Sequence, residues 1–124
     1  MAIYESGENY LETILILQGK CEKVRAVDVA NELGYSKASV SRAMSILKKA
    51  EYIAIENGGN ILLTEFGKQK ALDIFNRHKI ITEFLVKTLE VDIDTADKDA
   101  CRIEHVISPQ VFEKMKERVE NDKY

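Results

Sequence analysis

The strongest chemical signal in the chain is a group of three side chains near its C-terminal end, Cys101, Glu104 and His105. If this stretch is helical, the thiol, the carboxylate and the imidazole occupy positions i, i+3 and i+4, so all three point the same way. Thiolate and imidazole suit transition metals and are poor ligands for magnesium or calcium. The spacing therefore predicts part of a transition-metal site on one helical turn.

Composition predicts a globular protein of one domain or two small lobes, because the chain has 124 residues, of which 45% are hydrophobic and 31% charged. No apolar stretch approaches the roughly 18 to 20 residues of a membrane span, and the N-terminus lacks a basic start followed by an apolar run. We therefore expect a cytoplasmic protein with no membrane partner. Cys21 and Cys101 predict no disulfide framework, which leaves Cys101 available as a ligand.

Charge is unevenly distributed, although the net charge is only −3. Residues 36–49 contain four basic residues and no acidic one, whereas residues 90–104 contain six acidic residues and two basic ones. Either stretch alone is consistent with a solvated charged face. Their separation along the chain favours one region that faces DNA and another that binds a cation.

The first half of the chain shows the pattern of a helix-turn-helix. Apolar residues at helical spacing predict helices over about 6–18, 25–33 and 36–50. Ser6 and Ser36 are the expected N-caps, while Gly19 ends the first helix and Gly34 supplies the turn. Helix, glycine-containing turn and helix form the motif that places a recognition helix in the major groove of DNA.

A β-hairpin and three further helices are predicted after this motif. Residues 52–55 and 61–63 are rich in strand-forming residues, and an Asn-Gly-Gly-Asn turn over 57–60 joins them as a wing. Thr64 is the expected cap of a long helix over about 65–89. An acidic connector over 91–96, a helix over about 95–106 and a last helix that begins at Ser108 and Pro109 follow.

Five segments in order carry a resemblance to a known family: residues 8–12 (ENYLE), the helix-turn-helix between 29 and 41, residues 63–67 (LTEFG), residues 77–78 (RH) and residues 100–105 (ACRIEH). Over nearly its whole length the chain resembles the diphtheria-toxin-repressor-type proteins, which are iron- and manganese-dependent repressors. Its end near residue 124 is similar to the short manganese-regulator branch, which lacks the SH3-like domain of the longer iron regulators.

The resemblance agrees with the predicted elements and implies a mainly helical fold with a small β-hairpin. A winged helix-turn-helix DNA-binding domain is expected over 1–70, and a helical metal-binding and dimerisation domain over 71–124. The metal ligands that the resemblance implies come from three helices and are Asn9, Glu12, His78, Cys101, Glu104 and His105.

Four of these six residues also have an ordinary structural explanation. A lone histidine such as His78 in an apolar stretch is usually a core residue, Glu104 and His105 can form a surface pair, and a free cysteine is commonly a small buried hydrophobe. On the first helix, Asn9 and Glu12 lie at i, i+3 on a face other than that of the apolar stripe. Their joint occurrence in one chain favours the metal site.

Two positions depart from the family pattern and two others combine its branches, and all four bear on which metal binds. Asn9 stands where the iron branch has a thioether and the manganese branch a carboxylate, and Thr82 replaces a common acidic residue. Glu12 resembles the manganese branch, whereas Cys101 resembles the iron branch, and its thiol favours iron(II), cobalt or zinc unless only its backbone carbonyl coordinates. We expect Mn(II) or Fe(II) as the cofactor, with Co(II) or Zn(II) binding in vitro.

The expected DNA contacts lie at the start of the recognition helix and on the wing, and are Lys37, Ser39, Ser41, Arg42, Asn57 and Asn60. Arg42 has the bidentate geometry for guanine, and Lys37 suits a phosphate. For the serines near this helix start, a role within the first turn is the alternative.

The resemblance implies a metal-loaded homodimer that binds a palindromic double-stranded DNA operator and represses metal-uptake genes, and no small organic substrate is expected. Two alternatives remain open from the residues. One is a metal-independent winged-helix regulator whose C-terminal helices only dimerise. The other is a thiol enzyme with Cys101 as nucleophile and His105 as base, for which the sequence offers no convincing third group.

Overall fold

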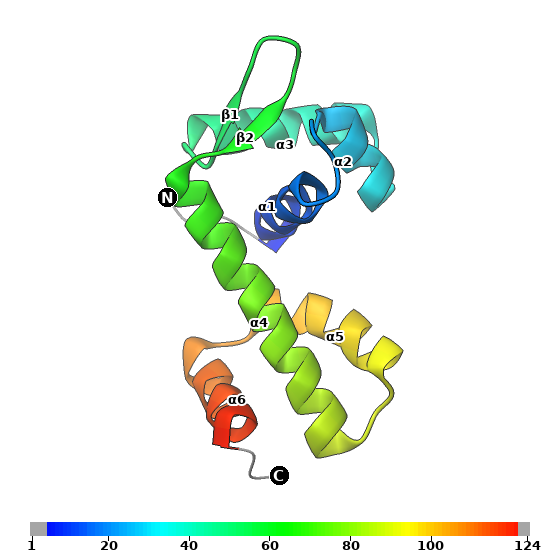
Figure 1. Cartoon of the computed structure of the whole chain (residues 1–124), viewed down its shortest axis with the longest axis vertical. Coiled ribbons are helices and arrows are strands. Elements are labelled where there is room, and N and C mark those ends of the chain that lie inside the picture. The colour runs from blue at the N-terminus through cyan, green and yellow to red at the C-terminus, as the bar shows by residue number, and fades with distance from the viewer. Residues whose placement is uncertain (1–4, 122–124) are drawn as a thin grey trace. The chain divides into compact units, whose positions relative to one another are not determined.

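A computed structural model describes residues 5–121 of the chain (Figure 1). Within these residues the elements are, in order, α1 (Glu5–Gln18), α2 (Ala26–Leu33), α3 (Lys37–Lys49), β1 (Ile53–Ile55), β2 (Ile61–Leu63), α4 (Glu65–Leu89), α5 (Ile93–Val106) and α6 (Pro109–Asn121). The expected fold class, mainly helical with one small hairpin, is confirmed. The chain divides into two compact units between Leu72 and Asp73, within α4.

The first unit forms the predicted helix-turn-helix around a continuous apolar core. Gly34 ends α2 in the left-handed conformation with φ 72°, which only glycine adopts without cost. Ser36 then caps α3, because its hydroxyl oxygen accepts a hydrogen bond from the backbone N–H of Ser39 at 3.2 Å. The most buried core residues come from α1, α2, α3 and the hairpin, and include Leu11, Ile14, Val29, Val40, Leu47 and Ile61.

The wing is a two-stranded antiparallel hairpin, as predicted. Ile53 pairs with Leu63 and Ile55 with Ile61. Gly58 and Gly59 both have positive φ, 91° and 90°, so the Asn-Gly-Gly-Asn turn places its glycines where other residues would be strained.

Thr64 links the hairpin to the start of α4, also as predicted. Its hydroxyl oxygen accepts a hydrogen bond from the backbone N–H of Gly67 at 3.0 Å and lies 2.7 Å from the carbonyl oxygen of Glu51, to which it can donate. Tyr52 and Phe66 stack beside this turn, with ring centroids 4.6 Å apart. The first turn of α4 is therefore fixed to the end of α3 and to the hairpin.

The second unit packs α5 and α6 against the C-terminal part of α4. Its core contains Ile81 and Leu85 of α4 with Ala96 and Ala100 of α5, and Phe112 of α6 packs against this cluster. Ser108 caps α6 as predicted, since its hydroxyl accepts a hydrogen bond from the backbone N–H of Val111 at 3.2 Å.

Two predicted boundaries are wrong. Helix α5 begins at Ile93 rather than near residue 95, because the carboxylate of Asp92 accepts a hydrogen bond from the backbone N–H of Thr95 at 2.8 Å and caps the helix there. Helix α1 already includes Ser6, so Ser6 does not stand before it as a cap. Within residues 5–121, no helix combines the length and the hydrophobicity needed to cross a membrane.

Candidate metal centre and nucleic-acid interface

His78 lies on α4 in the second unit and is held on both sides by carboxylates from α5. Its Nδ1 atom lies 2.8 Å from Oε2 of Glu104, and its Nε2 atom lies 2.6 Å from Oδ1 of Asp97. The two carboxylates differ in environment, because the Glu104 side chain is completely buried while that of Asp97 is 64% exposed. His78 is therefore a polar junction between two helices and not an apolar core residue.

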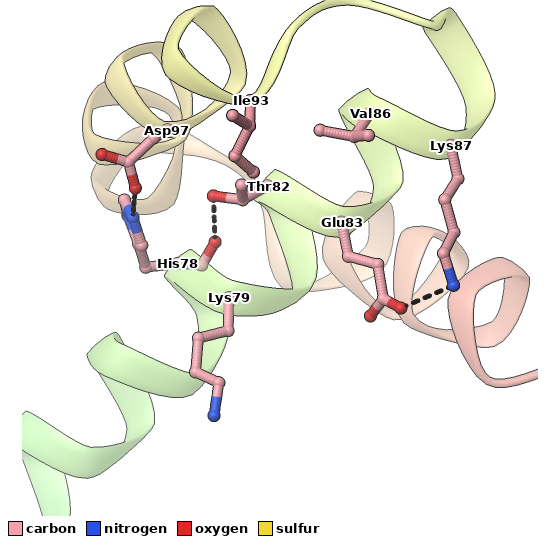
Figure 2. A pocket seen from close by; sticks show the side chains of 8 residues that line it. All are labelled: His78, Lys79, Thr82, Glu83, Val86, Lys87, Ile93 and Asp97. Carbon is pink, nitrogen blue, oxygen red and sulfur yellow. Dashed lines mark hydrogen bonds and ion pairs between the residues drawn. The ribbon is translucent and has the colours of Figure 1, made fainter.

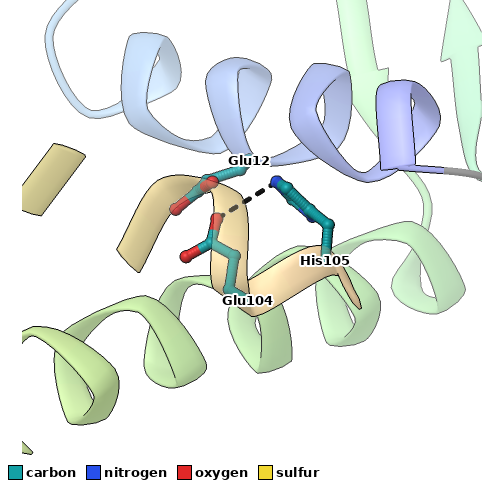
Figure 3. Close-up of side chains that lie close together, drawn as sticks. All are labelled: Glu12, Glu104 and His105. Atoms are coloured by element: carbon teal, nitrogen blue, oxygen red, sulfur yellow. Dashed lines mark ion pairs between the residues drawn. The ribbon is translucent and has the colours of Figure 1, made fainter. Parts of the chain in front are cut away.

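Glu104 faces two imidazoles. Its Oε1 atom, for which the described residues provide no hydrogen bond, lies 3.3 Å from Nε2 of His105, and Figure 3 draws this pair on α5. Burying a carboxylate costs several kcal/mol or more unless charge or hydrogen bonds compensate it. A buried carboxylate between two imidazole nitrogens is a donor set that a borderline divalent cation suits. The residues present in the second unit thus fit a metal ion.

Cys101 and Thr82 are close in sequence to Glu104 and His78, and the two differ in burial. Cys101 is exposed on α5, three residues before Glu104, so the alternative explanation of this cysteine as a small buried hydrophobe is wrong. Thr82 is buried on α4, and its hydroxyl donates a hydrogen bond to the backbone carbonyl of His78 at 2.8 Å. Coordination by the Cys101 thiol stays a prediction.

The first unit carries the two other predicted metal ligands on α1. Asn9 is half-buried, and its backbone carbonyl accepts a hydrogen bond from the hydroxyl of Thr13 at 2.8 Å. Glu12 is buried, and Glu8, one turn earlier, forms an ion pair with Lys70 at 3.2 Å. The sequence interpretation did not single out Glu8, although its i, i+4 spacing from Glu12 places both carboxylates on one face of the helix.

Asp97 is the second polar residue that the sequence interpretation missed. It precedes Glu104 by seven residues, so both lie on the same face of α5 two turns apart. That spacing was visible in the sequence, but six acidic residues between 90 and 104 gave no means of choosing among them. Only the packing of α5 against α4 distinguishes Asp97 from the others.

The N-terminal half of α3 presents the predicted DNA contacts to solvent. All four of them, Lys37, Ser39, Ser41 and Arg42, are exposed. The 13 residues of α3 contain no acidic side chain. Ser39 also takes part in the helix cap, because its hydroxyl accepts a hydrogen bond from that of Ser36 at 2.9 Å. The face has the charge that a DNA backbone requires.

The two predicted wing residues differ in their surroundings. Asn57 is exposed in the turn. Asn60 uses its side chain within the unit, where Oδ1 accepts a hydrogen bond from the backbone N–H of Val24 at 3.0 Å and Nδ2 donates one to Oε1 of Glu56 at 2.8 Å. The structure thus gives Asn60 a role in holding the wing, and a DNA contact from it stays a prediction.

Two family profiles together match almost the entire chain. The profile described as the N-terminal DNA-binding domain of iron-dependent repressors matches residues 2–59. The profile described as the metal-binding and dimerisation domain of iron-dependent repressors matches residues 64–124.

Individual relatives agree with these matches. An uncharacterized HTH-type transcriptional regulator of Methanocaldococcus jannaschii is 33% identical over 113 residues, which cover 90% of this chain and 90% of that protein. The HTH-type transcriptional regulator MntR of Bacillus subtilis is 31% identical over 103 residues, which cover 83% of this chain and 72% of that protein.

Solved structures show the same fold. A manganese-dependent transcriptional repressor in complex with manganese matches with a TM-score of 0.84 at 23% identity, over 92% of this chain and 52% of that one. The manganese regulator SloR matches with a TM-score of 0.80 at 25% identity, over 98% of this chain and 55% of that one. The chain therefore spans about half the length of these two solved regulators.

Proposed function

The chain belongs to the iron-dependent repressor family of DNA-binding transcriptional regulators, and from that premise we propose that it is a cytoplasmic homodimer, which binds a palindromic operator and represses metal-uptake genes. The observation that carries the metal dependence is the buried Glu104 carboxylate between the imidazoles of His78 and His105. The family is one of regulators and not of enzymes, which removes the thiol-enzyme alternative.

The proposed metal ligands in the second unit are His78, Glu104 and His105, with the Cys101 thiol or backbone carbonyl as a further donor. Glu12 and Asn9 are proposed as the donors from α1, in accordance with the family resemblance and with the residue types at those positions. A divalent cation supplies the positive charge and the directional bonds that let donors from different helices act together. Glu12, with Asn9, would then tie the helix-turn-helix unit to the dimerisation unit.

This connection explains how metal would control DNA binding. Two recognition helices of a dimer reach successive major grooves only when they are about 34 Å apart, which is one turn of DNA. Ligands on both units would restrict that spacing. Moving such a switch from mostly off to mostly on needs about 5.5 kcal/mol of differential binding, and several metal–ligand bonds can provide this.

For the natural cofactor we propose Mn(II) or Fe(II), with Co(II) or Zn(II) binding in vitro. Carboxylate and imidazole donors accept all four ions, and a thiolate from Cys101 would shift the preference towards iron, cobalt or zinc. Among the similar solved structures, three proteins are described as manganese regulators or as manganese-dependent or manganese-activated repressors, and one of these, ScaR, was also solved with bound zinc and with bound cadmium. Because zinc forms more stable complexes than manganese or iron with such donors, availability in the cell must help to select the ion.

On the DNA side, we propose that Arg42 contacts a guanine edge and that Lys37 neutralises a phosphate. Ser39 and Ser41 are proposed as further contacts at the start of the recognition helix, and exposed Asn57 on the wing as a contact to the backbone or the minor groove.

A mobility-shift titration on a family-like palindrome tests the proposal. The metal-free full chain is titrated separately with Mn(II), Fe(II), Co(II) and Zn(II) under reducing conditions and at one salt concentration, since affinity for DNA depends steeply on salt. We expect strong binding only in the loaded protein and its loss in Glu104→Gln, which keeps the shape of the side chain but removes its charge. Equal affinity of the metal-free and loaded protein would select the metal-independent regulator instead.

A further inference from the structure

We propose that Asp97 is a positioning residue, which fixes the imidazole of His78 in the one state that leaves its Nδ1 atom available to a metal ion. The inference rests on the proposed function, because it concerns how a proposed ligand is held. Its basis is the 2.6 Å contact between Oδ1 of Asp97 and Nε2 of His78, on the side of the ring opposite to Glu104.

The two ring nitrogens of His78 have different neighbours, and this difference assigns their roles. Nδ1 faces Glu104, which is buried and is itself a proposed ligand, whereas Nε2 faces the exposed Asp97. Metal-bound histidines almost always donate the N–H of their other nitrogen to a carboxylate, a backbone carbonyl or a water. The geometry thus makes Nδ1 the coordinating atom and Nε2–H the donor to Asp97.

The two carboxylates compete for the single proton of a neutral imidazole. Glu104 favours the tautomer that carries the proton on Nδ1, and that tautomer has no lone pair there for a metal. Asp97 favours the tautomer with the proton on Nε2, which leaves the Nδ1 lone pair directed at the donor set. Without Asp97, the tautomer that cannot bind through Nδ1 gains population. The apparent metal affinity then falls in proportion to the remaining population of the tautomer that can bind.

Asp97 is the carboxylate in contact with Nε2 of His78. His78 and Asp97 both line a groove of about 370 Å³ between α4 and the start of α5, and Figure 2 shows the contact between their side chains. The nearby hydroxyl of Thr82 donates to the backbone carbonyl of His78 and not to its ring. The other acidic lining residue, Glu83, forms an ion pair with Lys87 at 2.8 Å.

Metal affinity of matched variants provides the first test. The full chain and the variants Asp97→Ala, Asp97→Asn and Asp99→Ala are titrated with Zn(II) and Cd(II) in competition with a chelating dye. Asp99 is exposed on the same helix, so Asp99→Ala removes the same charge without touching His78. We expect Asp97→Ala to weaken binding by about 10- to 100-fold and Asp97→Asn, whose amide oxygen still accepts the Nε2–H, to weaken it less.

NMR of the cadmium-113 complex with nitrogen-15-labelled histidine provides the second test, and only two histidines need to be assigned. We expect cadmium coupling to Nδ1 of His78 and a proton on its Nε2. Cadmium coupling to Nε2, or equal metal affinities for Asp97→Ala and Asp99→Ala, would overturn the role proposed for Asp97 but not the proposed function. If the unmodified protein bound neither ion, the proposed function would fail together with this inference.

Discussion

The side chain of Asn60 holds the wing to the segment that precedes α2, because its amide oxygen accepts the backbone N–H of Val24 at 3.0 Å. The next residue, Ile61, donates its own N–H to the carbonyl of Val24 at 2.7 Å, so the end of the turn and the start of β2 are tied to the same residue. Since Val24 is only 1% exposed, water cannot easily replace the Asn60 contact. Asn60 thus has a structural role independent of any contact with DNA.

Replacement of Asn60 by alanine should therefore reduce stability. Leaving the buried N–H of Val24 without an acceptor costs about 1 to 3 kcal/mol in the free energy of unfolding, measurable by urea denaturation. Asn57→Ala, an exposed change in the same turn, is the control and should stay within about 0.5 kcal/mol. If Asn60→Ala left unfolding unchanged but weakened operator binding, the DNA contact would be the main role of Asn60.

Gly67 tolerates no side chain, because the first turn of α4 packs directly on the backbone of Tyr52. A Cβ atom placed on Gly67 would overlap the carbonyl group of Tyr52, a backbone neighbour that cannot rotate away. We expect Gly67→Ala to lower the free energy of unfolding by about 3 kcal/mol or more, at the upper end of overpacking effects.

The matched control is Gly19→Ala, since an added Cβ there meets its nearest atom, the Ile16 carbonyl oxygen, at 3.4 Å. This variant should unfold at nearly the same denaturant concentration as the original chain. Similar losses in both variants would mean that helix ends in general, and not the contact with Tyr52, account for the effect of Gly67→Ala.

Local signals in the sequence were enough to predict most of the fold. Gly34 and Ser36 mark the turn before the recognition helix, and Thr64 and Ser108 mark the starts of α4 and α6, where the structure has them. The start of α5 was misplaced because Asp92 is one of several acidic residues in its stretch. Any of these acidic residues could have capped the helix, and only the backbone structure identifies Asp92 as the cap.

The site was less predictable than the fold, because its properties depend on contacts distant in sequence. Glu104 and His105 were chosen from their spacing, but the burial of Glu104 and its contact with His78 depend on how α4 and α5 pack. Asp97 lies 19 residues from His78, and no local sequence pattern predicts that the two side chains pair. The identity of the metal depends on donor chemistry and on availability in the cell, and the spacing of residues in the sequence does not reveal it.

Arg42 provides a test of base recognition on α3. If its guanidinium binds a guanine, Arg42→Ala should weaken binding to the operator by about 1 to 3 kcal/mol and reduce discrimination against random DNA. Lys48→Ala, which removes one exposed positive charge from the last turn of the same helix, should weaken binding to both DNAs alike. Fluorescence anisotropy with both DNAs measures the difference. An equal loss on both DNAs for Arg42→Ala would assign it to a phosphate.

Asp92 provides a test of pH dependence in the second unit. Hydrogen bonds from the backbone N–H and the hydroxyl of Thr95 hold the pKa of Asp92 below its ordinary value of 3.8. Because the pKa is lower in the folded state, the carboxylate contributes stability above the unfolded-state pKa, and this contribution is lost as the pH falls through the folded-state pKa.

Asp92→Asn should remove that dependence, since asparagine caps a helix about as well as aspartate but does not titrate. We expect the melting temperature of the original chain to fall more steeply than that of Asp92→Asn as the pH is lowered from about 5 to below the ordinary aspartate pKa. Thermal unfolding followed by circular dichroism measures both curves. Asp94→Asn, which removes a charge from the first turn and keeps the cap, should retain the steep fall. Parallel curves for the original chain and Asp92→Asn would show that the cap does not depend on the charge of Asp92.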